Sequence, residues 1–195
     1  MTHRISKLPD VQFFLKPGYV MINREPTLVR TVLGNCVAVT LYDKVHRFGG
    51  IHQFVFPVAD KPENATPQYG NVGIPALLRL IDDLGGNRSS LIAQIIGGSR
   101  NTDYADDDLG ERNVTLARKV LNKYQVPIVS EDVGGSLGRK VIYHTGTNET
   151  AIFRVATLRQ TDWFLPGMDL RYIPASAKKN MRSGPEGRRQ SDSRK

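Results

Sequence analysis

Hydrophobic positions near the start of the chain recur with the spacing of β-strands. Residues 29 to 32 are rich in β-branched side chains, and residues 37 to 42 place large apolar side chains on alternate positions. A polar connection follows, and residues 48 to 56 then predict the partner strand of a hairpin that ends at Pro57. This part of the chain therefore predicts paired β-strands.

Helical spacing appears in the middle of the chain. Pro75 stands where the first turn of a helix is expected, and a glycine pair at 85 and 86 ends that helix. Its inward stripe is apolar: Leu77, Leu80, Ile81 and Leu84. A second amphipathic helix is expected over residues 113 to 124. Strands are expected at four further places: residues 91 to 96, 126 to 129, 140 to 143 and 151 to 155.

The mixture of strands and helices predicts one α/β domain without internal repeats. The 195 residues, of which 39% are hydrophobic and 24% charged, suffice for one core and a short appendage. We expect an N-terminal extension over residues 1–14, a folded domain over 15–176 and a tail over 177–195. The single cysteine allows no internal disulfide, and no apolar run is long enough for a leader or a membrane span, so a cytoplasmic protein is expected.

Positive charge is concentrated at the C-terminal end. The formal net charge is +8, and residues 177–195 hold seven Lys and Arg against two acidic residues, a net +5. This segment has no apolar periodicity, so the sequence predicts a disordered, solvated basic tail. No pattern of basic and aromatic residues indicates a stacking surface, so no specific nucleic-acid partner and no membrane insertion are expected.

Cys36 is the first candidate for chemistry. It follows a glycine turn and precedes an apolar run, and such a turn can present a thiol beside free backbone N–H groups. The competing interpretation is a small buried apolar residue. A nucleophilic thiol needs a proton carrier, and His52 lies in the strand expected to pair with that of Cys36. One thiol and four scattered histidines give no metal-ligand spacing, so no metal and no organic cofactor are expected.

Several short motifs follow one another in order between residues 15 and 157. They are LGNCVAV at 33 to 39, LYD at 41 to 43, GGI at 49 to 51 leading to Pro57, GG at 97 and 98, GERN at 110 to 113, and DVGGSLGR at 132 to 139. Each motif is weak alone, but the ordered set resembles the CheD family of chemoreceptor glutamine deamidases.

The resemblance implies an α/β/α-layered deamidase with a Cys–His pair and an assisting threonine. The implied substrates are glutamines on the cytoplasmic helices of methyl-accepting chemotaxis receptors, and a CheC-type phosphatase is the implied partner. Cys36 would attack the glutamine carboxamide, with N–H groups around Asn35 and Cys36 holding the oxyanion. A protonated imidazole would assist the departure of ammonia, and water would cleave the thioester.

Two departures from the family pattern concern the residues around Cys36. The family histidine stands seventeen residues after the cysteine, where this chain has Gln53, and His52 is displaced by one position. Because neighbouring strand residues face opposite sides, His52 would need a bulge beside the glycine pair at 49 and 50 to reach the thiol. Thr31, five residues before Cys36, is assigned as the assisting threonine, and Asn35 replaces the usual serine.

Three functions stay open from the sequence. The first is an active chemoreceptor glutamine deamidase, and the second is a catalytically weakened relative that binds receptors or a CheC-type phosphatase. The third is an unrelated cysteine hydrolase or a protein that binds through its basic tail. If Gln53 occupies the place of the imidazole, we expect slow deamidation and a thiol pKa near the ordinary value of about 8.5.

Overall fold

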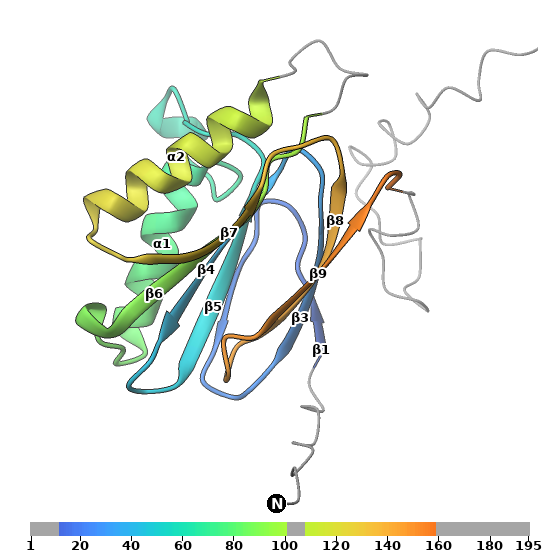
Figure 1. Cartoon of the computed structure of the whole chain (residues 1–195). Coiled ribbons are helices and arrows are strands. Elements are labelled where there is room, and N and C mark those ends of the chain that lie inside the picture. Colours follow the sequence, from blue (N-terminus) through green and yellow to red (C-terminus); the bar gives the residue numbers. More distant parts are fainter. Residues whose placement is uncertain (1–11, 101–107, 159–195) are drawn as a thin grey trace, which may run out of the picture. The chain divides into compact units, whose positions relative to one another are not determined.

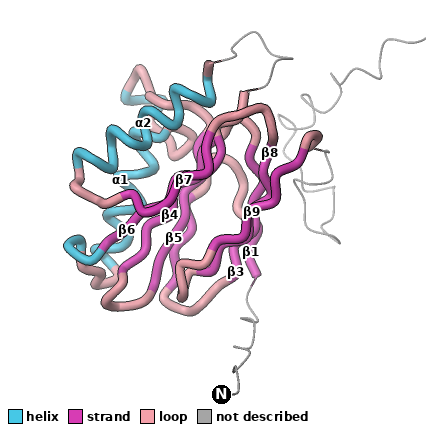
Figure 2. The backbone as a smooth tube through the Cα atoms, in the orientation of Figure 1, coloured by secondary structure: helices cyan, strands magenta, loops and turns pink. Residues whose placement is uncertain are grey.

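Two β-sheets and two α-helices form layers in the computed structural model, which describes residues 12–100 and 108–158 (Figures 1 and 2). One sheet has the strand order β2-β5-β4-β6-β7 and the other the order β1-β3-β8-β9. The strands of the first sheet are β2 (Val20–Asn23), β4 (Val37–Asp43), β5 (Phe48–Phe54), β6 (Leu91–Gly97) and β7 (Ile128–Val133). Those of the second are β1 (Gln12–Phe14), β3 (Leu28–Leu33), β8 (Gly138–His144) and β9 (Thr150–Val155).

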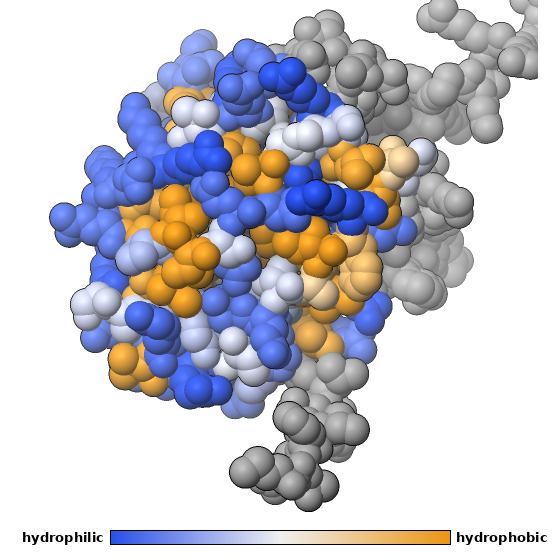
Figure 3. Space-filling model, viewed as in Figure 1, coloured by the Kyte–Doolittle hydropathy of each residue, from blue (hydrophilic) through white to orange (hydrophobic). Residues whose placement is uncertain are grey.

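Both helices cover the same face of the five-stranded sheet. Helix α1 (Gly70–Asp83) packs mainly on β5 and β2, and α2 (Leu109–Lys123) packs on β6, β4 and β7 (Figure 1). Two short 3-10 helices, Pro62–Asn64 and Arg88–Ser90, lie in the connections on either side of α1. The edge strands β7 and β9 carry the exposed side chains of Val129 and Phe153. Apolar patches alternate with hydrophilic surface on the face seen in Figure 3.

Two buried cores separate three layers. One core lies between the helices and the five-stranded sheet and includes Val39, Phe54 and Leu77. The other lies between the two sheets and includes Leu33, Cys36 and Tyr143. The expected α/β domain is confirmed, but within the described residues the third layer is a second sheet instead of further helices.

The observed elements differ from the expected ones where local sequence is a poor guide. Strand β1 lies inside the expected N-terminal extension and pairs in parallel with β3, so the folded domain already includes Gln12. Helix α1 begins at Gly70, five residues before Pro75. Its first turn contains glycines, which have low helix propensity but allow the helix to pack closely against β5, so the sequence pattern did not predict this turn. Strand β2 was not expected from its short apolar run.

The boundaries at the C-terminal side lie outside the described residues. The described residues, 12–100 and 108–158, belong to one compact unit. The expected domain end at residue 176 and the basic tail over 177–195 both fall beyond residue 158. Among the described residues, no helix is long and apolar enough to cross a membrane.

Candidate active site around Cys36

The register between β4 and β5 decides which side chain can face Cys36. Ala38 is opposite Gln53 and Val39 is opposite His52, and the pairing continues without a shift past the glycines at 49 and 50. The bulge that would turn His52 toward the thiol is therefore not present in this ladder. Since successive strand residues face opposite sides of the sheet, Gln53 and His52 enter different layers.

The Gln53 side chain lies between the two sheets. Its Nε2 donates to the carbonyl of Val32 at 3.1 Å, and its Oε1 accepts from the hydroxyl of Thr31 at 2.5 Å. The Thr31 hydroxyl also lies 3.0 Å from the carbonyl of Leu15, so one hydrogen is shared between two acceptors. Thr31 and Gln53 are both buried, and Gln53 lies near enough to the Cys36 thiol to lower its pKa. The thiol itself donates to Oδ1 of Asn35 at 3.9 Å.

The Cys36 thiol lies in the short loop between β3 and β4 and is only 6% exposed. Burial raises the pKa of this thiol to about 11, while hydrogen bonds from Gln53 and from the amide of Cys36 itself lower the pKa only in part. The expectation of an ordinary pKa near 8.5 is wrong because stacking of the two sheets removes the thiol from water. The thiol is therefore protonated at neutral pH.

The His52 imidazole lies under α1, on the other side of the five-stranded sheet. Its Nδ1 is 3.2 Å from the carbonyl of Tyr19, which can only accept, so Nδ1 carries the ring hydrogen. The ring stacks on Phe54 with centroids 5.5 Å apart, and a Cβ placed at Gly73 would overlap the ring. Within the described residues its Nε2 has no hydrogen-bond partner, and burial lowers the His52 pKa to about 4.

These positions correct the sequence-based choice of His52 as the proton carrier. The structure brings Thr31 and Cys36 together through Gln53 and leaves His52 in the helix-facing core. No hydrogen bond joins a histidine ring to the Cys36 thiol in the described part of the chain. An imidazole with a pKa of about 4 would also be neutral at physiological pH.

The backbone around Cys36 is held through its carbonyl groups. The Gly34 carbonyl accepts from the amide of Ser99 at 3.0 Å, and the Cys36 carbonyl accepts from the amide of Gly98 at 2.8 Å. Gly98 has a φ of +65°, and a Cβ there would crowd Val114 and the carbonyl of Gly110. The loop after β6 therefore needs glycine to approach both the cysteine loop and α2.

The DVGGSLGR motif supports that loop from the other side. Arg139, only 2% exposed, donates to the carboxylate of Asp132 and to the carbonyls of Gly134 and Leu137. The amide of Gly134 in turn donates to the carbonyl of Gly97 at 2.9 Å. The buried guanidinium of Arg139 therefore organises the turn.

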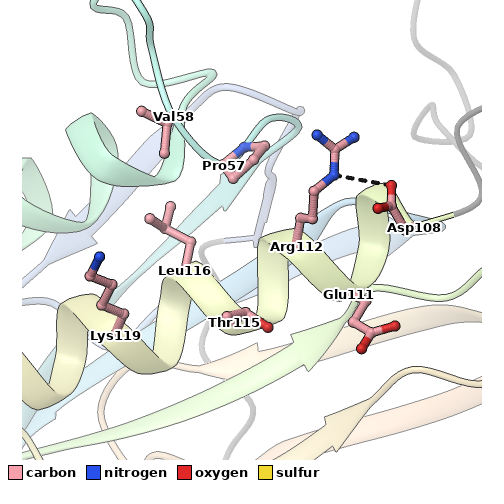
Figure 4. A pocket seen from close by; sticks show the side chains of 8 residues that line it. All are labelled: Pro57, Val58, Asp108, Glu111, Arg112, Thr115, Leu116 and Lys119. Atoms are coloured by element: carbon pink, nitrogen blue, oxygen red, sulfur yellow. Dashed lines mark ion pairs between the residues drawn. The ribbon is translucent and has the colours of Figure 1, made fainter.

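A groove runs beside α2, outside the buried site. Its volume is about 510 Å³, and it lies between the segment after β5 and the outer face of α2 (Figure 4). Pro57, Val58 and Leu116 give it apolar walls, while Arg112 pairs with Asp108 at its edge. None of Thr31, Cys36 or Gln53 lines this groove. Among the described residues, no group of three or more His, Cys, Asp or Glu could hold a metal ion.

Asn113 is the site residue whose contact the sequence did not predict. It is fully buried in α2, and its Nδ2 donates to the carbonyls of Asn35 and Val55. The available signal was an amide on the inward side of an amphipathic helix, where apolar residues are the norm. The contact with Asn35 joins residues 78 positions apart, so the local sequence does not predict it.

Comparison with known proteins points to chemotaxis. A family model described as CheD chemotactic sensory transduction matches residues 57–154. This match begins after Cys36, Gln53 and Thr31, so it does not by itself transfer a catalytic role to them. It does include Asn113 and Arg139.

Curated relatives extend the similarity over more of the chain. A protein of Trichlorobacter lovleyi named probable chemoreceptor glutamine deamidase CheD is 36% identical over 148 residues, which cover 75% of this chain and 92% of the relative. A relative of the same description from Anaeromyxobacter dehalogenans is 38% identical over 68% of this chain and 78% of its own length. Another from Geobacter sulfurreducens is 35% identical over 80% of this chain and 96% of its own.

Proposed function

The chain belongs to the CheD family of chemotactic sensory transduction proteins, and from this we propose that it is a chemoreceptor glutamine deamidase of low turnover. Its nucleophile is Cys36, and its substrates are selected glutamine side chains on the cytoplasmic helices of chemotaxis receptors. The low turnover is supported by Gln53, whose side chain lies near the thiol and cannot carry a proton near neutral pH.

The reaction follows from thiol chemistry at a carboxamide. The Cys36 thiolate attacks the side-chain carbonyl carbon of a receptor glutamine, and the amides of Asn35 and Cys36 stabilise the oxyanion. Collapse of the intermediate expels ammonia, which takes up one proton, and leaves a thioester on Cys36. Water then cleaves the thioester, which releases glutamate on the receptor and restores the thiol.

Gln53 and Thr31 support this chemistry without moving protons. A carboxamide donates and accepts hydrogen bonds but does not titrate near neutral pH. Gln53 therefore orients the thiol, and Thr31 fixes the Gln53 amide through its hydroxyl. The proton of the buried thiol has to leave without an imidazole, so the attack step is slow at neutral pH.

Glutamine at position 53, in place of a histidine, also favours a second function. A relative with a protonated thiol and no imidazole beside it can retain binding while its turnover falls to zero. The groove along α2, with apolar walls and charged residues at its rim, offers a surface for a receptor helix or a CheC-type phosphatase (Figure 4). In this case the protein acts in the cytoplasm as a regulator that occupies receptors or the phosphatase.

Mass spectrometry of a receptor substrate separates the two functions. The full chain and Cys36→Ala are each incubated with a receptor cytoplasmic fragment, and glutamines are examined for a one-dalton mass gain while released ammonia is measured. We expect a slow, stoichiometric gain with the wild type and none with Cys36→Ala. Equal deamidation by Cys36→Ala would contradict the nucleophile, and receptor binding without any mass gain would favour the regulator.

A further inference from the structure

Asn113 connects three parts of the molecule through one nitrogen atom. It lies in α2, is 0% exposed, and its Nδ2 donates to the Asn35 carbonyl at 3.2 Å and to the Val55 carbonyl at 2.8 Å. Asn35 precedes the nucleophile, and Val55 directly follows β5. Both hydrogens of this amide nitrogen are used, so a single side chain ties the cysteine loop to the end of β5.

The bond to Asn35 completes a pattern along the cysteine loop. Three successive carbonyls, those of Gly34, Asn35 and Cys36, accept hydrogen bonds from the amide of Ser99, the side chain of Asn113 and the amide of Gly98. Only the middle one is held by a side chain. Across the described residues, the backbone amides of Asn35 and Cys36 donate to no carbonyl or side-chain oxygen.

Because the carbonyls are held in place, peptide geometry also fixes the directions of the Asn35 and Cys36 N–H groups. In a trans peptide the C=O and the following N–H point in opposite directions. Fixing the Asn35 carbonyl toward α2 therefore aims the Cys36 N–H away from α2. The bond between the Gly34 carbonyl and the Ser99 amide aims the Asn35 N–H away from the loop after β6. The Cys36 amide also lies close enough to its own sulfur to interact with the thiol.

We propose that Asn113 is a positioning residue for the reaction, because it holds the peptide between Asn35 and Cys36 so that the Cys36 N–H stabilises the oxyanion formed by thiol attack. This role rests on the proposed function, since it assumes that Cys36 attacks a carbonyl carbon. In the described residues, the hydrogen bonds of Asn113 go to backbone carbonyls and none goes to the thiol. Its effect reaches the reacting atoms through the backbone.

The requirement for asparagine follows from the two acceptors. Two carbonyl oxygens converge on one nitrogen, which demands two N–H donors on a short side chain. Aspartate has the same shape but presents only acceptors to these oxygens when it is ionised, and alanine leaves both oxygens unpaired. Leaving a buried carbonyl without a hydrogen bond has a free-energy cost. The peptide is therefore expected to rotate toward another donor when Asn113 is replaced.

Two reactions of the same thiol separate positioning from general structural support. Acylation by p-nitrophenyl acetate passes through a tetrahedral oxyanion, expels p-nitrophenolate and leaves a thioester on Cys36. Alkylation by iodoacetamide displaces iodide at a saturated carbon and forms no oxyanion. Since Cys36 is the only cysteine in the chain, subtraction of the Cys36→Ala rate isolates its reactions from those of the amines.

The experiment compares the full chain with Asn113→Ala and Asn113→Asp. Asn122→Ala is the matched control, because Asn122 is an exposed asparagine in the same helix. Both rates and the melting temperature are measured for each protein. We expect the ratio of acylation to alkylation to fall roughly tenfold or more in both Asn113 variants, somewhat below the roughly 10²–10³-fold cost of deleting an oxyanion donor. Alkylation should stay within about threefold of wild type, in line with an unchanged thiol environment.

Other results would overturn the proposal. An unchanged ratio would show that the peptide keeps its orientation without Asn113. Acceleration of both reactions together with a large loss of melting temperature would show that Asn113 only keeps the thiol buried. Acylation of wild type no faster than of Cys36→Ala would overturn both this inference and the nucleophile assignment. A reduced ratio in a protein whose wild type leaves receptor glutamines unchanged would support Asn113 and contradict the proposed substrate.

Discussion

Two neighbouring residues of β5 enter two different environments. Gln53 points between the sheets, where it meets Thr31 and Cys36, and His52 points toward α1, where it stacks on Phe54. Both side chains are fully buried. One position along a strand therefore separates a residue that can act on the thiol from one that can only pack.

The titratable residue of the two, His52, lies in the helix-facing layer, whereas Cys36 lies in the core between the sheets. In the helix-facing layer, burial makes His52 a neutral ring with one hydrogen bond to the Tyr19 carbonyl. In the layer between the sheets, the same effect keeps Cys36 protonated, and the group beside it cannot carry a proton. Burial thus disfavours the charged form on both sides, with opposite consequences for the two pKa values.

The largest expected effect is a gain of activity from Gln53→His. An imidazole at this position would replace an orienting amide by a group that accepts the thiol proton, which is worth roughly 10²–10⁴-fold in rate. The Thr31 hydroxyl already faces this position and would orient the new ring. Receptor deamidation is measured by the rate of the one-dalton mass gain at pH 7.5.

His52→Ala is the matched control for that substitution. It removes an imidazole one residue away that has no contact with the thiol, so turnover of the folded variant should stay within about threefold of wild type, as expected for a group outside the proton path. Loss of all activity in His52→Ala with the fold retained would contradict the conclusion that His52 faces away from the thiol.

A smaller effect is expected where α1 crosses the His52 ring. A Cβ at Gly73 would overlap the imidazole, so Gly73→Ala should destabilise the fold by about 3 kcal/mol, as overpacking of a core does. In the His52→Ala background the overlap is gone, and Gly73→Ala should become neutral or stabilise α1 by about 1 kcal/mol through helix propensity. Urea unfolding of the four proteins measures this cycle, and equal effects in both backgrounds would place His52 elsewhere.

The dependence of the free energy of unfolding on pH, on the acidic side, should also reflect the titration of His52. Its folded pKa of about 4 lies below the ordinary value of 6.5, so the folded state binds fewer protons than the unfolded state between these pH values. The stabilisation is present above pH 6.5 and is lost as the pH falls toward 4, by up to about 3 kcal/mol. His52→Leu should flatten this part of the curve, whereas an unchanged slope would show that another group titrates there.

Much of the fold follows from the pattern of apolar residues. The hairpin of β4 and β5 and the stripe of α1 were predictable because their periods are regular. The first turn of α1 was not, since its glycines are selected by the approach of the helix to β5. Strand periodicity also does not say which strands share a sheet, so the second sheet was not foreseen.

The candidate site likewise has features that the sequence predicts and features that depend on the tertiary structure. The choice between His52 and Gln53 could be posed from the sequence, because it depends on the alternation of one strand, but only the register of β4 with β5 answers it. The contact of Asn113 with Asn35 joins residues 78 positions apart, and no local pattern predicts it. The raised thiol pKa likewise required the two sheets to be stacked.

The pH dependence of Cys36 alkylation tests most directly whether Gln53, and not His52, faces the thiol. Iodoacetamide rates are measured from pH 5 to 10 for wild type, His52→Ala and Gln53→His. We expect the wild type and His52→Ala to rise together about tenfold per pH unit without an inflection near neutrality, as a thiol pKa of about 11 requires. Gln53→His should show a new plateau around pH 6 to 8, in the range where imidazoles titrate. A neutral inflection in the wild type that disappears in His52→Ala would contradict the account.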